Sequence, residues 1–393
     1  MFTTASPTLT IIFWLLAALV LYTYLGYGVV AWVWARLHGS RRSVPAGQFE
    51  PEVTLVVPAY NEGSILSAKV RNCLALNYPS AKLHLLFITD GSTDNSAEVL
   101  APYPSVRHLH TPERAGKTVA ENRAIRYVTT PYVIFTDCNT TLNPEAVREL
   151  VRHYADPKVG AVSGEKRVLR DGSTSGAGEG LYWKYESFLK RCDSDIYSLM
   201  GAAGELVSFR TSLFKPLEKD TILDDFVQSM RIVEAGYQVV YEPAAYALEL
   251  PSASVTEEME RKTRIAAGGW QSMVRLRALL NPFAQPVVFF LYLSHRVLRW
   301  SVTPLALALL LPLTAYLALA GPLFYTLALG AQVLFYGAAL LGWARSARQQ
   351  SAGPLLVAMY FTMMNIAVFL GFWRYVRKAQ PAAWAKAQRV VTQ

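Results

Sequence analysis

Three sets of acidic residues have the types and positions that chemistry would need. Asp90 and Asp137 each follow an apolar run typical of a buried strand, and Asp224 and Asp225 stand together at a predicted helix start. In open α/β sheets, ligands bind beyond the carboxyl ends of the strands, so we expect Asp137 and Asn139 to emerge into a crevice. Their oxygens suit a hard divalent cation whose remaining ligands come from a bound diphosphate. The alternative is that Asp137 caps a turn and that the adjacent acids only face a helix dipole.

Two further segments suggest contacts with a nucleotide. Asp90 opens the sequence Asp90-Gly91-Ser92-Thr93-Asp94, which fits a nucleoside contact at a strand end or, equally, a turn and helix N-cap. Gly116-Lys117-Thr118 looks like the end of a P-loop, but Thr111 stands where that motif needs its first glycine, so we reject it. Lys117 remains a candidate phosphate contact, and the alternative is a solvated lysine in the first turn of a helix.

Alternating strand and helix patterns place these residues on an α/β fold. Residues 171–180 are rich in Gly and Ser and predict a mobile loop beside the site. Apolar, β-rich runs predict strands at 53–57, 83–89, 106–109, 132–135 and 159–169. Helices are expected from about Ser64, from the segment 114–118 through Tyr127, after Asn143-Pro144, from the segment 223–226 to Gly236 and from about Thr256 to Arg277.

The apolar residues gather at the two ends of the chain. Of the 393 residues, 52% are hydrophobic, and Met1 to Ala35 carry no charge over a length that crosses a bilayer once. No charge lies between Arg299 and Arg345, where Gly321-Pro322 separates two spans, and 353–373 makes a third. We therefore predict an N-terminal transmembrane helix (1–35), a compact domain (50–281), an interfacial amphipathic helix (282–300), three transmembrane helices (301–376) and a basic tail (377–393).

Basic residues flank the predicted spans. By the positive-inside rule, these flanks and the central domain face the cytoplasm, so the chain is expected to be a multi-pass protein of the inner (plasma) membrane. The side of the basic tail stays open. The net charge of +9 favours anionic lipids and substrates over nucleic acid, because no basic stretch alternates with stacking aromatics. Three isolated cysteines without metal-type spacing fit a reducing compartment. The flanking residues are Arg36, Arg41, Arg42, His295, Arg296, Arg299, Arg345 and Arg348.

Taken in order, five motifs resemble the membrane-integrated family 2 glycosyltransferases, the group of cellulose, chitin and hyaluronan synthases. The resemblance implies a GT-A-type (Rossmann-like) mixed sheet in the cytoplasm, α-helical transmembrane spans and a nucleotide-sugar donor. It implies that Ala59, Tyr60, Glu62 and Asp90 hold the nucleoside. The motifs are Val57 to Glu62, Asp90 to Asp94, Phe135 to Asn139, Gly201 to Arg210 and Leu223 to Phe226.

The same resemblance implies the catalytic parts. Asp137 would bind Mg²⁺ or Mn²⁺ on the diphosphate, with Asn139 in the place of a second aspartate. Asp225 would be the general base on the acceptor hydroxyl, and Asp224 stands where the family has glutamate. Gly204 and Glu205 are expected to approach the acceptor.

One family signature, Gln-x-x-Arg-Trp on the last helix of the domain, is missing. Arg261, Arg264, Trp270 and Gln271 occupy that region in another order, so we expect the arginines to contact the donor and the other two the acceptor. This departure puts processive chain growth in doubt.

The resemblance implies inverting transfer from a UDP-sugar to a saccharide in β-linked exopolysaccharide synthesis. The alternatives are transfer of one sugar to a lipid, or a catalytically silent nucleotide-sugar-binding subunit of an export complex. The sugar, the linkage, the acceptor and any homo-oligomer or export partner stay open.

Overall fold

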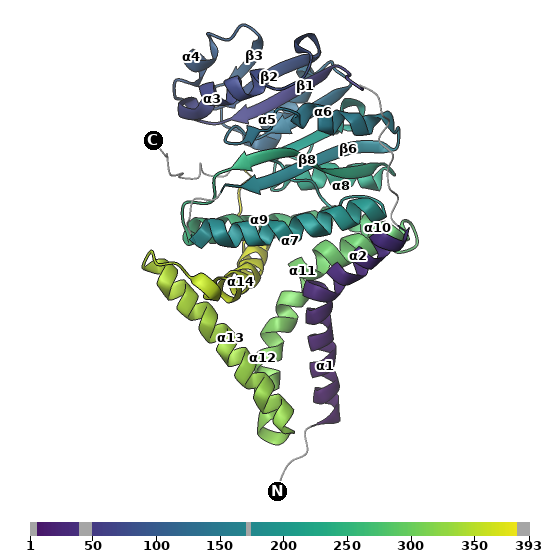
Figure 1. The fold of residues 1–393 in the computed structure, drawn as a ribbon, viewed down its shortest axis with the longest axis vertical. Helices are drawn as coiled ribbons and strands as arrows, with labels where there is room; N and C mark the ends of the chain where they lie inside the picture. Colours follow the sequence, from purple (N-terminus) through teal and green to yellow (C-terminus); the bar gives the residue numbers. More distant parts are fainter. Residues whose placement is uncertain (1–5, 39–48, 170–173, 383–393) are drawn as a thin grey trace.

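A mixed sheet of eight strands forms the upper part of the molecule in the computed structural model, which describes residues 6–38, 49–169 and 174–382 (Figure 1). The strand order is β3-β2-β1-β4-β7-β6-β8-β5. The strands are β1 Val53–Ala59, β2 Leu83–Asp90, β3 Val106–Thr111, β4 Tyr132–Thr136, β5 Thr141–Leu142, β6 Val159–Val168, β7 Leu206–Arg210 and β8 Gln238–Glu249.

Parallel pairing brings the predicted strand ends to one edge of this sheet. β1 is parallel to β2 and β4, β2 is parallel to β3, and β7 is antiparallel to β4 and β6. All five predicted strands exist, but β5, β7 and β8 have no counterpart in the prediction. β8 contains Pro243, which weakens a strand pattern. The structure accommodates Pro243 in a register shift, where Gly164 pairs with Glu242 and Glu165 with Tyr246.

Apolar side chains bury both faces of the sheet, as expected for central parallel strands. On one face, Leu55 and Val57 join a core with α3 (Gly63–Leu74) and α6 (Ala146–Val151). On the other face, Val56 joins a core with α5 (Lys117–Ala124), α8 (Asp224–Glu234) and α10 (Pro286–Tyr292). The shorter helices are α4 Ser96–Leu100 and the 3₁₀ turns η2 Ser80–Lys82, η3 Ile125–Tyr127, η4 Arg152–Ala155, η5 Thr211–Leu213 and η6 Arg277–Leu280.

Two long helices, α7 (Thr174–Ile196) and α9 (Val255–Arg275), lie beneath the sheet (Figure 1). α9 agrees with the predicted last helix of the domain. The predicted mobile loop is wrong for residues 174–180, which form the first turns of α7, while residues 170–173 lie outside the described part. Tertiary packing explains the difference, because a Cβ at Gly178 would lie 2.5 Å from the Tyr360 ring.

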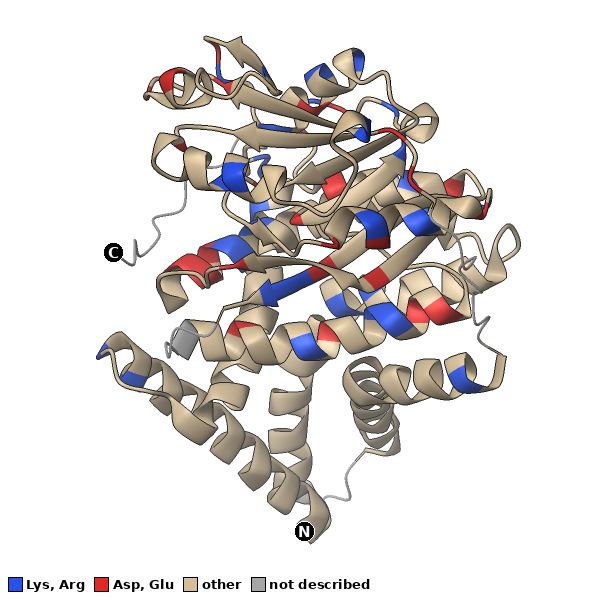
Figure 2. Cartoon of the chain, turned by 45° about the horizontal axis from the view of Figure 1, so that its top comes forward, with Lys and Arg blue, Asp and Glu red and all other residues tan. Residues whose placement is uncertain are grey.

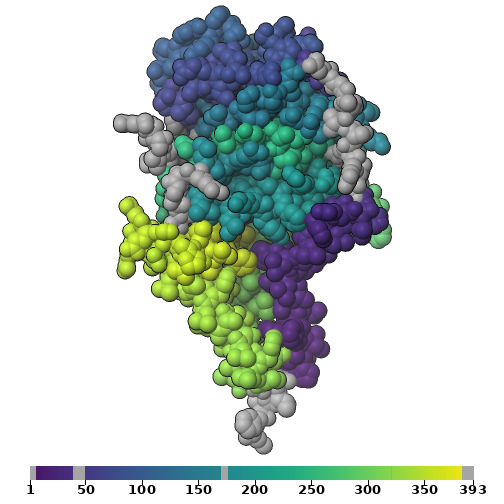
Figure 3. Space-filling model, in the orientation of Figure 1, coloured from purple at the N-terminus to yellow at the C-terminus, as the bar shows by residue number. Residues whose placement is uncertain are grey.

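Below these helices stand four helices that are long and apolar enough to cross a membrane. The first, Pro7–His38, comprises α1 (Pro7–Leu21), a π-helical segment η1 (Tyr22–Gly26) and α2 (Tyr27–His38). The others are α12 (Val302–Ala320), α13 (Leu323–Ala347), and η8 (Gly353–Leu355) continued by α14 (Leu356–Val376). They form a narrow stalk under the wider sheet domain (Figure 3), and charged residues concentrate in that domain (Figure 2). The number of helices that could span a membrane agrees with the prediction, and their insertion and orientation stay predictions.

The segment predicted as an interfacial helix is helical, and basic residues near its end are buried within the protein. It comprises α10, the π-helical η7 (Leu293–Val297) and α11 (Leu298–Trp300). His295 is fully buried and Arg296 is buried against α7, where their partners are Asp193 and Glu186. These charges therefore join the sheet domain to the apolar helices.

Candidate active site

A cavity of about 870 Å³ lies where the sheet meets α7, α9 and α14. Its polar end is lined by residues that follow strands or open helices, and its other end by apolar residues of α14. The lining residues at the polar end are Lys117, Asp137, Gly204, Glu205, Asp224 and Asp225, and those of α14 include Val357, Phe361, Met364 and Val368.

Four elements bring the predicted catalytic residues together. Asp137 follows β4, Lys117 begins α5 and Asp225 lies in the first turn of α8. Gly204 lies between them, because a Cβ there would be 3.0 Å from Asp225 Oδ2 and 3.1 Å from Lys117 Nζ. Only a residue without a side chain allows the lysine and the carboxylate to approach this backbone so closely.

Lys117 is the cation of this acidic cluster. Its Nζ donates to Asp137 Oδ1 at 2.6 Å and lies 3.8 Å from Glu121 Oε1. Burial opposes its charge, but Asp137 and Asp224 together raise the pKa of Lys117 well above its ordinary value. In this structure Lys117, the predicted phosphate contact, therefore pairs with carboxylates of the protein itself.

Asp224 and Asp225 have different surroundings. Asp224 is the first residue of α8, and its Oδ1 accepts the backbone N–H of Asp225 at 3.0 Å. Asp225 Oδ1 accepts the N–H of Phe226 at 2.8 Å, while Oδ2 faces Gly204 and the cavity. Burial, and then the charge of Asp224, raise the pKa of Asp225 to about 7. A carboxylate with a pKa near neutrality can accept a proton from a bound hydroxyl.

Asp137 fits a divalent cation only as a single protein ligand. Among the described residues, no group of three or more His, Cys, Asp or Glu side chains is arranged to hold a metal ion. Asn139 Nδ2 donates to Glu249 Oε1 at 2.6 Å, so the amide is engaged with that glutamate. Mg²⁺ is commonly bound through one or two carboxylates and substrate phosphates, which suits Asp137 once Lys117 releases it.

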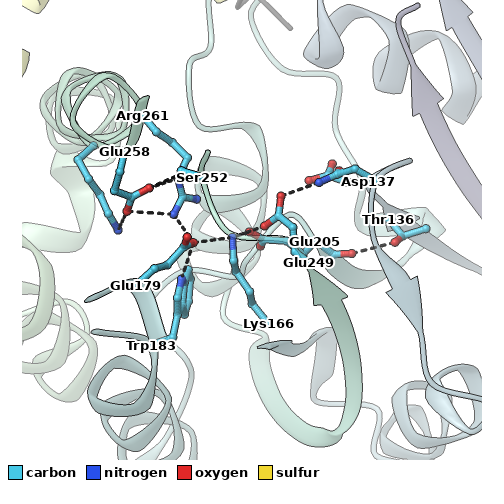
Figure 4. A network of polar contacts seen from close by, with 12 residues as sticks. Thr136, Asp137, Lys166, Glu179, Trp183, Glu205, Glu249, Ser252, Glu258 and Arg261 are labelled. Atoms are coloured by element: carbon cyan, nitrogen blue, oxygen red, sulfur yellow. Dashed lines mark hydrogen bonds and ion pairs between the residues drawn. The ribbon is translucent and has the colours of Figure 1, made fainter. Parts of the chain in front are cut away.

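A network of buried charges supports the cavity wall, and the sequence analysis missed most of it (Figure 4). Lys166 is fully buried and pairs with Glu179 at 3.2 Å, with Glu205 at 2.8 Å and with Glu249. Although burial opposes the change, Lys166 lowers the pKa of Glu205 to about 2. These partners come from β6, α7, β8 and a loop, so no sequence spacing relates them.

The arginines of α9 also contribute to the wall. Arg261 pairs with Glu179 at 2.5 Å and with Glu258 at 3.0 Å. Arg261 and Arg264 both line the cavity, so each is placed where a donor diphosphate would be within reach. Their donor role stays a prediction.

The residues predicted to hold a nucleoside lie at the carboxyl ends of β1 and β2. The guanidinium of Arg114 lies 3.8 Å from the ring centroid of Tyr60. Asp90 Oδ2 accepts the N–H groups of Ala115 and Gly116 at 2.9 and 2.7 Å. Asp90 therefore fixes the loop that leads into Lys117, a positioning role that strand-end reasoning missed. Ala59 and Glu62 lie beside this region, and none of the four predicted residues lines the described cavity.

Trp270 and Gln271 do not line the cavity either. Trp270 packs on Phe372 of α14 with ring centroids 4.8 Å apart. Gln271 accepts the N–H of Ile222 at 3.0 Å and donates to Asp220 O at 2.8 Å, so it holds the loop before Asp224. The contacts of both residues are internal to the protein, and an acceptor role for them finds no support in the cavity.

The mixed sheet with acidic residues at its carboxyl edge defines a GT-A-like glycosyltransferase fold. Across 94% of this chain and 99% of that chain, the structure is similar to a mannosyltransferase from Pyrobaculum calidifontis solved with GDP-mannose and Mn²⁺, with a TM-score of 0.74 and 23% identity. This likeness concerns the fold.

Comparison of sequences gives the family. Residues 54–215 match the family model of glycosyl transferase family 2, which assigns this segment of the chain to that family. Similar proteins include poly-β-1,6-N-acetyl-D-glucosamine synthases of Staphylococcus aureus (strain COL) and Staphylococcus epidermidis (strain RP62A), 26% and 25% identical over 231 residues. The match covers 57% of this chain and 56% of each relative, so the chain spans about half their length.

Proposed function

We propose that the protein is a membrane-bound inverting glycosyltransferase that uses a nucleotide sugar, expected to be a UDP-sugar, to extend a saccharide during β-linked exopolysaccharide synthesis. Membership of family 2 and the names of the two relatives support this proposal. The donor nucleotide needs a direct test, because the mannosyltransferase with a similar fold was solved with GDP-mannose.

The position of Asp225 is the observation that carries the proposed chemistry. An inverting transfer requires a base on the acceptor hydroxyl and charge compensation for the leaving diphosphate. Asp225 Oδ2 faces the cavity beside Gly204 and Lys117, where it takes the proton of an acceptor oxygen as that oxygen attacks the anomeric carbon. The nucleoside diphosphate leaves from the opposite face of the sugar.

The leaving diphosphate is proposed to lie between Asp137, Lys117 and the arginines of α9. A divalent cation, Mg²⁺ or Mn²⁺, held by Asp137 would offset charge on the diphosphate. Lys117, freed from Asp137, and Arg264 would donate charge-assisted hydrogen bonds to its oxygens. Asp225, with a pKa of about 7, would assist the attacking oxygen, and the cation and basic residues would stabilise the leaving diphosphate.

A lipid is a second candidate acceptor, and the shape of the cavity favours it. The cavity extends from Asp225 to Phe361 and Met364 of α14, one of the four helices apolar enough to cross a membrane. An acceptor with a hydrocarbon portion would reach the base from the bilayer. The candidate role of a catalytically silent subunit has no such observation in its favour.

The test is a donor screen with the purified full-length chain in a mild detergent. Release of nucleoside diphosphate from a panel of UDP- and GDP-sugars, with Mg²⁺ or Mn²⁺, identifies the donor, and mass spectrometry of the product measures its length. A polymer supports exopolysaccharide synthesis, and one sugar on a lipid supports the second candidate. Absence of nucleotide release with every donor and acceptor would refute the enzyme proposal.

A further inference from the structure

Lys190 on α7 is a buried cation without an ion-pair partner. It is 3% exposed and lines the cavity, and among the described residues it forms no hydrogen bond or salt bridge. Its Nζ lies 4.9 Å from the ring centroid of Trp183 and 5.9 Å from that of Tyr241, whose own hydroxyl is buried without a partner. A buried charge is costly unless an opposite charge compensates it. Lys166, by contrast, has three carboxylate partners.

Two arginines beside Lys190 line the same cavity and increase the excess of positive charge. Arg296 and Arg299 share one carboxylate, Glu186, at 2.7 and 3.2 Å. His295 uses a second carboxylate, Asp193, which also accepts the Tyr27 hydroxyl. Lys190, Arg296 and Arg299 therefore face the same cavity, and Glu186 is the carboxylate that both arginines share. Burial, together with the charge of Arg296, lowers the pKa of Lys190, although Glu186, Glu205 and Glu165 oppose that change.

Part of the lining that α14 contributes to this cavity is apolar. Val357, Phe361 and Met364 of α14 contribute aliphatic, aromatic and thioether surface to the same cavity. A saccharide placed there would bury hydroxyl groups without hydrogen-bond partners, which is costly. Trp183 is not a free stacking platform for a sugar ring, because Lys166 and Lys190 both lie near its ring, at 5.3 and 4.9 Å.

We propose that Lys190, Arg296 and Arg299 form a subsite for the phosphate of a lipid acceptor whose hydrocarbon chain lies along α14. The inference rests on the proposed function and names its acceptor class: an amphiphile with a phosphate at the boundary between its polar and apolar parts. The phosphate compensates the cations, and the chain occupies the apolar lining. The acceptor end then extends past Ala203 and Gly204 toward Asp225.

The experiment measures binding by native mass spectrometry, with full-length protein in a neutral detergent and no donor. The probes are decyl phosphate, decyl glucoside and inorganic phosphate. The variants are Lys190→Met, Lys190→Arg and the matched control Lys184→Met, which removes an exposed lysine from the same helix. Thermal unfolding of each variant shows that the comparison is made on folded protein.

We expect decyl phosphate to bind the wild type at least about tenfold more tightly than either other probe, because only it satisfies both parts of the subsite. Lys190→Met should weaken decyl phosphate binding about tenfold or more, since it removes a charge-assisted contact. Lys190→Arg and Lys184→Met should bind as the wild type does.

Three results would overturn the inference: equal binding by Lys190→Met, equal affinity for inorganic phosphate, or tighter binding of decyl glucoside than of decyl phosphate. The second would indicate a free-anion site, and the third a site that recognises a sugar and not a phosphate. Release of nucleoside diphosphate by the wild type is measured separately. If the wild type releases nucleotide but Lys190→Met binds decyl phosphate as well as the wild type does, only this inference is rejected. If decyl phosphate binding depends on Lys190 but no donor releases nucleotide, only the proposed function is rejected.

Discussion

Replacing Asp225 with asparagine should separate catalysis from folding at the candidate base. The amide keeps the size of the side chain and retains an oxygen for the N–H of Phe226, which Asp225 Oδ1 accepts at 2.8 Å. It cannot accept a proton from the acceptor hydroxyl. A positioned general base contributes about 10²- to 10⁴-fold, so turnover should fall by that factor while donor binding stays nearly unchanged.

The wild-type pH profile should report the same group. Because burial and the charge of Asp224 raise the pKa of Asp225 to about 7, turnover should fall about tenfold per pH unit below that value as the base becomes protonated. The residual turnover of Asp225→Asn should lack this limb, because its amide does not titrate.

Stability should change in the opposite direction to activity. Each pKa unit corresponds to about 1.4 kcal/mol, so the rise from 3.8 to about 7 sets an upper bound of about 4 kcal/mol on the cost of ionising Asp225 in the folded state. Its carboxylate faces a cavity that admits water, which reduces the expected cost to about 1–2 kcal/mol. The folded state holds the proton more tightly than the unfolded state, so the wild type loses stability as pH rises from about 4 to about 7.

Two assays compare the full-length wild type with Asp225→Asn: release of nucleoside diphosphate and thermal unfolding. Both are run between about pH 4.5 and about pH 8.5, a range that brackets the pKa of about 7. We expect the variant to be less active above about pH 7, with the difference in turnover narrowing toward pH 4.5 as the wild type loses its base. We also expect the variant to be more stable above about pH 7, with the stability difference shrinking toward pH 4.5. Variant turnover within threefold of the wild type above pH 7, or a stability difference independent of pH, would refute the reasoning.

Three other substitutions test the remaining parts of the site. Asp137→Ala should reduce Mn²⁺-dependent donor binding about tenfold or more in calorimetry, and unchanged metal dependence would contradict its assignment as the cation ligand. Gly204→Ala should lower turnover about ten- to hundredfold, because its Cβ would displace Asp225 Oδ2 and Lys117 Nζ from 3.0 and 3.1 Å; donor affinity should fall as well, since Lys117 is proposed to bind the diphosphate, and wild-type turnover would argue against this geometry. Lys166→Met should cost about 3–5 kcal/mol in unfolding experiments, since three carboxylates lose their shared cation, and a loss no larger than that of Lys184→Met would show that the network adds little stability.

Local patterns predict the strand ends of this protein well. Asp90 and Asp137 follow apolar runs whose period identifies buried strands, and parallel pairing brings such ends to one edge. The start of α8 is equally local, because Asp224 and Asp225 directly precede its apolar face. These features depend on neighbouring residues, so a single sequence contains them.

Features that depend on distant contacts are not predictable in this way. Residues 174–180 have a loop-like composition, yet they are helical. Gly178 packs against Tyr360, which lies more than 180 positions later in the sequence, so no local pattern could predict this contact. The roles of Asp90 in holding the loop before Lys117 and of Gln271 in holding the loop before Asp224 also arise only in three dimensions. Lys190 reads as an ordinary helix lysine until burial without an ionic partner distinguishes it.

Arg296 connects the two ends of the cavity. Its Nε donates to Met200 O at 2.7 Å, directly before Gly201, and its guanidinium lies 5.7 Å from the ring centroid of Phe226. Gly201 has a φ of 98°, and a Cβ there would lie 2.1 Å from that same ring, so the loop at Gly201 and the start of α8 are packed together beside this arginine. The segment that precedes α12 therefore positions Gly204 and Asp225 while contributing Arg296 to the proposed phosphate subsite. A lipid phosphate bound in the proposed subsite would therefore contact Arg296, the same side chain that packs against the loop beside Asp225.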